Sequence, residues 1–231
     1  MAPASILVIN PNSSQLITDG LAETLVAPPE AKLTFYTAPS HAPPSINDIV
    51  TANLTATACF QDILEKQLLE KHDGFLVCCF SDHPLAHMLR EVTTKPTIGI
   101  FEAAITQALL VGKRFGVVTT GTGYKFNLCN GVRAFMGANS ERFGLVTTGL
   151  GVLELREGDR EKIEKNMKEA SGEMASQGAD VILLGCAGMA GMESLVKQGA
   201  AEANPGLPPV RVLDGAKAGV EMLSALIRSS V

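Results

Sequence analysis

Two cysteines occupy equivalent places in two similar stretches of the sequence. Residues 73–79 and 180–186 each begin with an aspartate, continue with an apolar run and end, six residues later, in a cysteine. An apolar run this short predicts a buried strand of a parallel sheet. Cys79 and Cys186 then lie at carboxyl ends of strands, where open α/β sheets bind their ligands. The repeat therefore predicts one site lined by two thiols.

Two thiols on opposite sides of a flat substrate can carry out acid–base chemistry. One ionised thiol removes a proton from a carbon atom, and the other, protonated thiol returns a proton to the opposite face. This inverts a stereocentre without a metal or an organic cofactor. We expect the helix N-termini that follow the two strands to lower the pKa of both thiols. Backbone N–H and hydroxyl groups of the turn 119–121 are natural donors to the intermediate carbanion.

The repeat extends over both halves of the chain and indicates the fold class. At the start of the two halves, Asn10 aligns with Thr119 and Asn12 with Gly121. Each half then has a second and a fourth strand-like run. These runs are residues 32–37 and 95–104 in the first half, and residues 142–148 and 209–218 in the second half. Helical periodicity fills the gaps, with large apolar side chains at Ile49, Leu54 and Ile63 in residues 46–70, and a clear apolar face in residues 159–177.

Strands that alternate with helices indicate right-handed βαβ units and parallel sheets. We predict an α/β fold of two lobes related by a pseudo-twofold, each a four-stranded parallel sheet flanked by helices. The first domain comprises residues 1–98 plus 213–231, and the second comprises residues 99–212. The last helix, 214–228, is expected to return and pack on the first lobe.

The segment Asn10–Ser14 connects the first strand to a helix at residues 15–26. Asn12 or Ser13 is a candidate N-cap residue, and Gln15 follows Asn12 at the spacing of a capping box. The same turn can also close over a polar ligand at the carboxyl end of the strand. The two interpretations are compatible, and the sequence leaves both open.

Composition and charge exclude several classes of function. The formal net charge is −5 and basic residues form no run, so we expect no nucleic-acid and no membrane partner. No stretch reaches the roughly 20 apolar residues of a transmembrane helix, and the start lacks the basic region of a signal peptide. Five cysteines without framework spacing indicate a reduced protein, which we expect in the cytoplasm.

Metal binding is an alternative interpretation of the region after the first cysteine. His83 and His87 are four residues apart and, on a helix, share a face with Cys79, which is a spacing that can bind zinc. No fourth ligand is evident, so we expect neither a metal nor another cofactor. Cys78 would point to the opposite face from Cys79 and is expected to be a packing residue.

Six motifs occur in a fixed order along nearly the whole chain. They are Ile9–Ser13, Pro43–Ile46, Cys79–Asp82, Gly99–Ala103, Val118–Gly121 and Leu184–Met189. As a set they resemble the aspartate/glutamate/hydantoin racemase superfamily and, within it, the hydantoin and allantoin racemase group. The insertion of His83 between Asp82 and Pro84 resembles the fungal branch more than the bacterial hydantoin racemases.

The resemblance implies that Cys79 and Cys186 are the catalytic pair and that a small-molecule substrate lodges between the lobes. It further implies substrate contacts from Asn12, Ser45, Phe80, Ser81, Thr119, Thr120 and Ala187. The expected activity is a cofactor-independent racemisation of a small cyclic ureide of hydantoin or allantoin type, by a homo-oligomer. The alternatives are a cysteine-dependent decarboxylase, a cis–trans isomerase, or a non-catalytic module that binds a small molecule.

Overall fold

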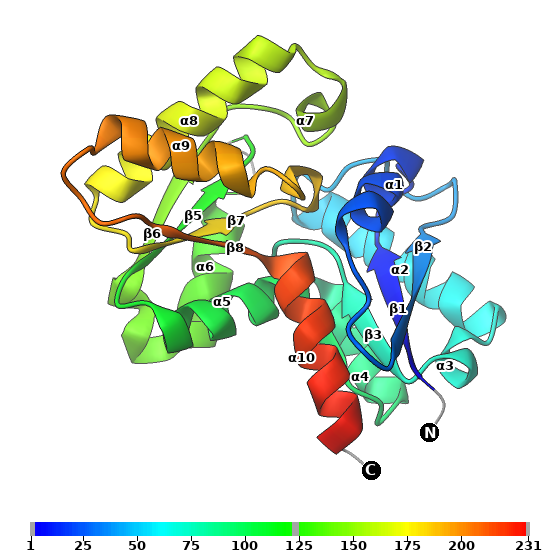
Figure 1. Cartoon of the computed structure of the whole chain (residues 1–231). Helices are drawn as coiled ribbons and strands as arrows, with labels where there is room; N and C mark the ends of the chain where they lie inside the picture. The colour runs from blue at the N-terminus through cyan, green and yellow to red at the C-terminus, as the bar shows by residue number, and fades with distance from the viewer. Residues whose placement is uncertain (1–2, 122–124, 230–231) are drawn as a thin grey trace. The chain divides into compact units, whose positions relative to one another are not determined.

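The computed structural model describes residues 3–121 and 125–229 and contains two four-stranded parallel sheets (Figure 1). The strand order is β2-β1-β3-β4 in one sheet and β6-β5-β7-β8 in the other. The strands are β1 Ala4–Asn10, β2 Ala31–Thr37, β3 Gly74–Val77, β4 Thr97–Gly99, β5 Phe115–Thr119, β6 Phe143–Thr147, β7 Val181–Leu184 and β8 Arg211–Asp214. The predicted α/β class with two four-stranded parallel sheets is confirmed.

Helices connect and cover the strands of both sheets. In chain order they are α1 Gln15–Thr24, α2 Ile49–Glu65, α3 Leu68–Lys71, α4 Pro84–Val92, α5 Ile100–Val111, α6 Lys125–Met136, α7 Glu154–Glu157, α8 Arg160–Ser176, α9 Glu193–Ala203 and α10 Gly215–Ser229, with 3-10 turns η2 Gly137–Arg142 and η3 Ala187–Met189. Among the described residues, none of the helices is both long and apolar enough to cross a membrane.

The chain forms two compact units, residues 1–103 with 216–231, and residues 104–215. Residues 99–103 and 213–215 fall on the other side of the boundary from the domains expected above. Those domain boundaries, and the pseudo-twofold relation of the lobes, stay predictions. Within the first unit, α10 packs on the sheet: a Cβ added to Gly219 would lie 2.5 Å from Leu76 Cδ1.

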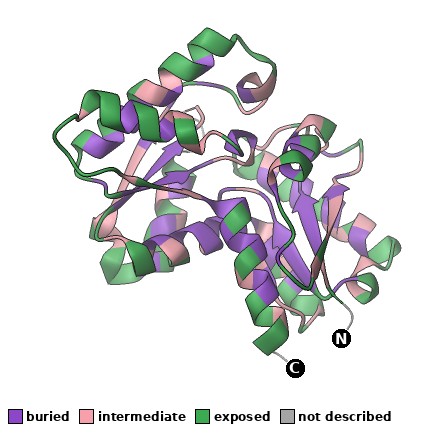
Figure 2. Cartoon of the chain, in the orientation of Figure 1, coloured by how far each residue is buried: buried purple, intermediate pink, exposed green. Residues whose placement is uncertain are grey.

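Successive side chains of a strand point to opposite faces of the sheet, and in the first sheet both faces are buried. Phe75 and Val77 pack with α2 and α4, together with Ile63, Leu85 and other core side chains, whereas Leu76 faces α10. Because both faces are covered, β3 is buried at every residue, as its uninterrupted apolar run predicts (Figure 2).

The second unit repeats this arrangement with its own core. Ile182 and Leu184 of β7 pack with Met167, Met174 and Val196, which α8 and α9 contribute. The predicted helix at residues 159–177 is confirmed, since α8 buries Met167 and Met174 as its periodicity indicates. The helices α8 and α9 lie together over the same sheet (Figure 1).

Candidate active site

Each sheet has a topological switch point at its two central strands. From β1 the chain crosses to β2 on one side, and from β3 it crosses to β4 on the other side. The second sheet has the same relation, with β5 and β7 at its centre. Ligands of open α/β sheets bind beyond the carboxyl ends of such a strand pair. The residues that follow these four strands are therefore the candidates for each unit's contribution to a site.

The turn after β1 is organised by the buried amide of Asn10. Its Nδ2 donates to Asn12 Oδ1 (3.1 Å), to the Ser14 carbonyl (2.9 Å) and to Thr18 Oγ1 (3.1 Å). Asn12 Oδ1 also accepts the Ser14 N–H at 2.9 Å. The predicted capping box is wrong: Ser14 is the N-cap residue of α1 and makes no side-chain cap bond. The turn is instead held by Asn10, and Asn12 is buried within it.

The loop that carries Ser45 adjoins this turn. The Ser13 N–H donates to the Pro43 carbonyl at 3.1 Å, and the half-buried Ser45 donates through its Oγ to Asn47 Oδ1 at 3.0 Å. The Asn12 turn and the Ser45 loop, which the resemblance implied in substrate contact, are therefore linked by hydrogen bonding within one unit.

Cys79 lies just beyond β3 and is half-buried. Its Sγ shares a hydrogen bond with the hydroxyl of Ser81 at 3.3 Å, and the Ser81 N–H donates to the Cys79 carbonyl at 2.9 Å. The ring of Phe80 is buried and packs edge-on against Phe101, with 5.7 Å between the ring centroids. Ser81 can therefore donate a hydrogen bond to an ionised Cys79, and Phe80 anchors the same turn in the core.

His83 is the N-cap residue of α4 and has a structural role. Its Nδ1 accepts the Leu85 N–H (3.3 Å), which leaves Nε2 to donate to Thr55 Oγ1 (3.2 Å). Ser81 and Asp82, which precede His83, do not cap the helix. Burial lowers the pKa of His83 to about 4, so the ring is neutral at neutral pH.

The zinc alternative requires ligands that are engaged elsewhere. Both ring nitrogens of His83 have hydrogen-bond partners, and His87 Nε2 lies 2.6 Å from Asp82 Oδ1. No group of three or more His, Cys, Asp or Glu side chains in the described part of the chain could hold a metal ion. The residues near Cys79 thus support thiol chemistry better than metal binding.

The corresponding turn of the second unit follows β5. Thr119 is buried and its Oγ1 donates to the Gly185 carbonyl at 2.8 Å, while the Gly185 N–H donates to the Val118 carbonyl at 2.8 Å. Thr120 is the next residue and is half-buried. These bonds place Thr119 and Thr120 beside the segment that carries Cys186.

Cys186 and Ala187 lie beyond β7, and both are half-buried. The Gly188 N–H donates to Cys186 Sγ at 3.3 Å. Burial raises the pKa of Cys186 to about 11. The Gly188 N–H and the charge of Arg156 act to lower this pKa, but their effect is smaller than that of burial. The expected lowered pKa is therefore wrong for Cys186. The thiol is followed by the short turn η3 instead of a long helix, so burial outweighs any helix dipole.

Two residues of this region were not among the predicted site residues. Asn10 carries a signal in the sequence, since a polar side chain at the end of a buried strand needs hydrogen-bond partners. Arg156 carries none, because it lies in a charged segment thirty residues before Cys186 and belongs to no motif.

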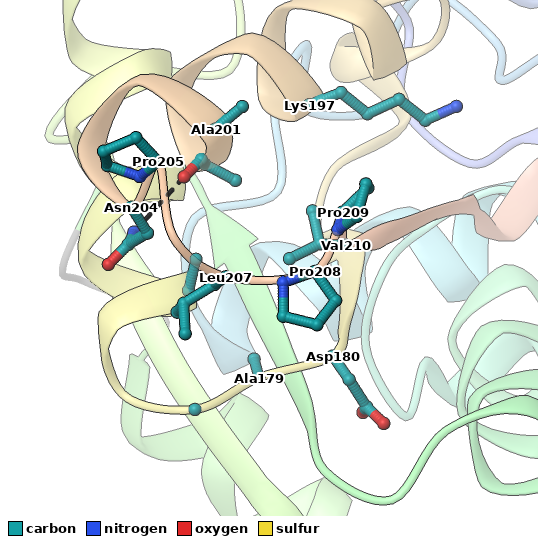
Figure 3. Close-up of a pocket in the computed structure, with 13 residues that line it drawn as sticks. Ala179, Asp180, Lys197, Ala201, Asn204, Pro205, Leu207, Pro208, Pro209 and Val210 are labelled. Atoms are coloured by element: carbon teal, nitrogen blue, oxygen red, sulfur yellow. Dashed lines mark hydrogen bonds between the residues drawn. The ribbon is translucent and has the colours of Figure 1, made fainter.

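A pocket of about 680 Å³ lies elsewhere in the second unit (Figure 3). It is lined by residues 178–180, which precede β7, and by Pro209 and Val210, which precede β8. It therefore lies at the amino ends of the strands, on the opposite edge from Cys186. The carboxylate of Asp180 already accepts the N–H groups of the two residues before β5. This pocket is not a candidate for the thiol chemistry.

The sequence was compared with known protein families. The family model described as Asp/Glu/Hydantoin racemase matches residues 6–223. The chain belongs to this family. Membership makes it an isomerase of the racemase type that acts on a small molecule, as the motifs of the sequence indicate.

The relatives of this racemase include fungal and bacterial proteins. It is 36% identical over 229 residues to an uncharacterised protein of Schizosaccharomyces pombe, covering 98% of this chain and 93% of the relative. It is 30% identical to the hydantoin racemase of Pseudomonas sp. (strain NS671), covering 96% and 85%. The structure of the allantoin racemase of Klebsiella pneumoniae matches with a TM-score of 0.82 at 27% identity, covering 99% and 89%. The fungal relative agrees with the fungal-like branch indicated by the sequence.

Proposed function

We propose that this racemase inverts a carbon stereocentre of a small cyclic ureide by proton transfer between Cys79 and Cys186, without a cofactor. The observation that carries the proposal is the equivalence of the two thiols. Each follows one of the two central strands of its sheet. The residue before each cysteine donates its N–H to the other central strand at 2.8 Å, Cys78 to the Ile9 carbonyl and Gly185 to the Val118 carbonyl.

The proposed reaction moves one proton on each face of the substrate carbon. The Cys79 thiolate takes the proton from one face, and the C–H electron pair is delocalised into the adjacent carbonyl. The Cys186 thiol gives its proton to the opposite face and becomes a thiolate. The reverse direction uses the same groups with their roles exchanged. Protons are conserved, and no redox partner is required.

The protonation of Cys186 supports its role as the resting acid. A thiol whose pKa is raised to about 11 by burial is protonated at neutral pH. The Gly188 N–H that points at its sulfur then stabilises the thiolate once the proton has left. At the other thiol, the Ser81 hydroxyl lies 3.3 Å from Cys79 Sγ and can stabilise an ionised Cys79 by a hydrogen bond.

The chemistry of the substrate class also favours a ureide. The ring carbonyls of a hydantoin delocalise a carbanion, so its proton is easier to remove than the α-proton of a free amino acid. Relatives named hydantoin racemase and allantoin racemase act on such rings. We further propose that the protein is cytoplasmic and that it forms a homo-oligomer. Light scattering would test the oligomeric state.

Solvent exchange of the substrate proton tests this function directly. In D2O we expect deuterium at the stereocentre, followed by loss of optical activity, for 5-substituted hydantoins or allantoin but not for free Asp or Glu. NMR and polarimetry follow the two events, with a sample lacking protein to measure spontaneous exchange. Protein dialysed against EDTA should be equally active. Exchange only in Asp or Glu, or evolution of CO2 from a malonate panel, would contradict the proposal.

The raised pKa of Cys186 predicts the pH dependence of its alkylation. Because only the thiolate reacts, a pKa above the ordinary value keeps the thiol form to higher pH. The rate of carbamidomethylation of Cys186 by iodoacetamide should therefore rise about tenfold per pH unit from pH 8 to 10. Peptide mass spectrometry separates Cys186 from the other cysteines. A plateau at or below pH 9 would show that burial does not control this thiol.

A further inference from the structure

Arg156 lies in α7, which packs against the turn that carries Cys186. A Cβ added to Gly188 would lie 3.3 Å from Leu155 Cδ1 and 3.3 Å from the Val152 carbonyl oxygen, so the two segments are in close contact. Arg156 Nη2 donates to the Ala190 carbonyl at 3.1 Å, just beyond η3. These contacts fix the guanidinium beside the Cys186 turn.

Part of this guanidinium is withdrawn from solvent. Its Nε is buried and has no hydrogen-bond partner among the described residues. A buried donor of a charged group that lacks a hydrogen-bond partner is costly unless an acceptor or a negative charge forms nearby. The Arg156 Nε donor is therefore not satisfied by the described part of the fold.

Among the carboxylates around Arg156, Glu154 is engaged with other groups. Glu154 on the same helix binds Lys162 (2.6 Å) and the Gly151 N–H (3.0 Å). Glu157 is exposed, and Glu193 lies at the start of α9. On the sheet side, Asp214 of β8 is paired in register with Leu184. Of these charged groups, Arg156 is the one whose charge acts on the Cys186 sulfur.

We propose that Arg156 is a positioning residue for Cys186: its guanidinium stabilises the thiolate that forms when Cys186 gives its proton to the substrate carbon. The inference rests on the proposed function for its catalytic meaning, but the stabilisation itself belongs to the resting protein. Arginine suits this task because it stays charged at every pH at which a thiol titrates.

The opposing influences on Cys186 show why such a residue is useful. Burial makes the thiolate costly, and it would leave Cys186 an acid that cannot easily release its proton. The Gly188 N–H and the Arg156 charge act in the other direction. Removal of the charge should therefore slow the steps in which the Cys186 thiolate forms from the resting thiol.

The test compares Arg156→Gln, Arg156→Lys and the control Arg160→Gln in the full chain. Arg160 is exposed and pairs with Glu164, so its loss removes the same formal charge from the adjacent helix. The readout is the rate of Cys186 alkylation by iodoacetamide from pH 8 to 10.5, resolved by peptide mass spectrometry with Cys129 as internal reference. We expect Arg156→Gln to slow the alkylation of Cys186 by about three- to tenfold, and Arg160→Gln to leave this rate unchanged.

Arg156→Lys keeps the charge and provides a second test. At pH 8, Cys186 of this variant should be alkylated nearly as fast as Cys186 of the parent. The ratio of the variant rate to the parent rate should then fall toward the ratio found for Arg156→Gln as lysine loses its proton, near its ordinary pKa of about 10.4. If Arg156→Gln does not fold, this falling ratio decides the question. A constant ratio, or an Arg156→Gln rate equal to the parent rate, overturns the proposal.

Failure of this inference and failure of the proposed function can be told apart. The alkylation needs no substrate, so slowed alkylation in Arg156→Gln supports the electrostatic role even if no ureide is racemised. Conversely, a racemase whose Arg156→Gln variant keeps the parent alkylation rate retains the proposed function and loses this role for Arg156.

Discussion

Replacement of either Cys79 or Cys186 by serine is expected to lower kcat for net racemisation by about 10³-fold or more. A serine hydroxyl is far too weakly acidic to act as the ionised base or to match the proton transfer of a thiol. Both cysteines are half-buried at the ends of strands, and serine is nearly the same size, so the fold should be kept. Circular dichroism and thermal unfolding verify that each variant is folded.

The two variants should differ in the proton exchange that survives. Each retains one thiol, so each is expected to exchange the proton of one enantiomer with D2O, and the preferred enantiomer should be opposite in the two variants. NMR of separate enantiomers measures this. Cys129→Ser is the matched control, since Cys129 is a half-buried cysteine of α6 without a proposed role. Full turnover in either Cys79→Ser or Cys186→Ser would indicate a one-base or covalent mechanism instead.

The sequence predicts the strand ends well because the signal there is local. An apolar run preceded by an aspartate and followed by small or polar residues has few alternatives to a buried parallel strand. The duplication of that run marked Cys79 and Cys186 as equivalent, and β3 and β7 do end two residues before them. Cys78, expected to be a packing residue, is buried.

The sequence predicts helix faces less well where small residues make the contact. The helix α2 exists as expected, but Ile49, Val50 and Leu54 are 51%, 62% and 55% exposed. Its buried side instead presents Ala52, Ala56 and other small side chains. A periodicity judged from large apolar residues cannot detect a helix that approaches its neighbours through alanines. Exposed apolar side chains on one helix are consistent with the proposed oligomer.

Tertiary contacts decide the details that the sequence missed around the thiols. The turn after β1 follows the amide of Asn10, whose bond to Thr18 joins it to the interior of α1. The start of α4 follows His83, which reaches Thr55 on another helix. The pKa of Cys186 depends on burial, which no motif records. Local patterns thus predict which residues matter, whereas the electrostatics require the folded chain.

Gly185, directly before Cys186, has no room for a side chain. An added Cβ would lie 2.7 Å from the Val118 carbonyl oxygen and 2.8 Å from the Thr119 Cβ. The same residue makes two hydrogen bonds that join β5 to the Cys186 segment, through its N–H to Val118 and its carbonyl to Thr119. The first unit has Cys78 at the equivalent position, so the requirement for glycine is specific to the second thiol.

Gly185→Ala is therefore expected to destabilise the protein by about 2–4 kcal/mol, because a rigid strand must move to admit the methyl group. It should also lower kcat by about 10²-fold in protein that is still folded, since Cys186 shifts with the strand. Urea unfolding measures the first effect, and racemisation at low temperature measures the second. Gly206→Ala is the control, because no heavy atom lies within 4 Å of the Cβ it would add. If Gly185→Ala matched that control in both measurements, the close approach of β5 and the Cys186 segment would not be needed to position the thiol.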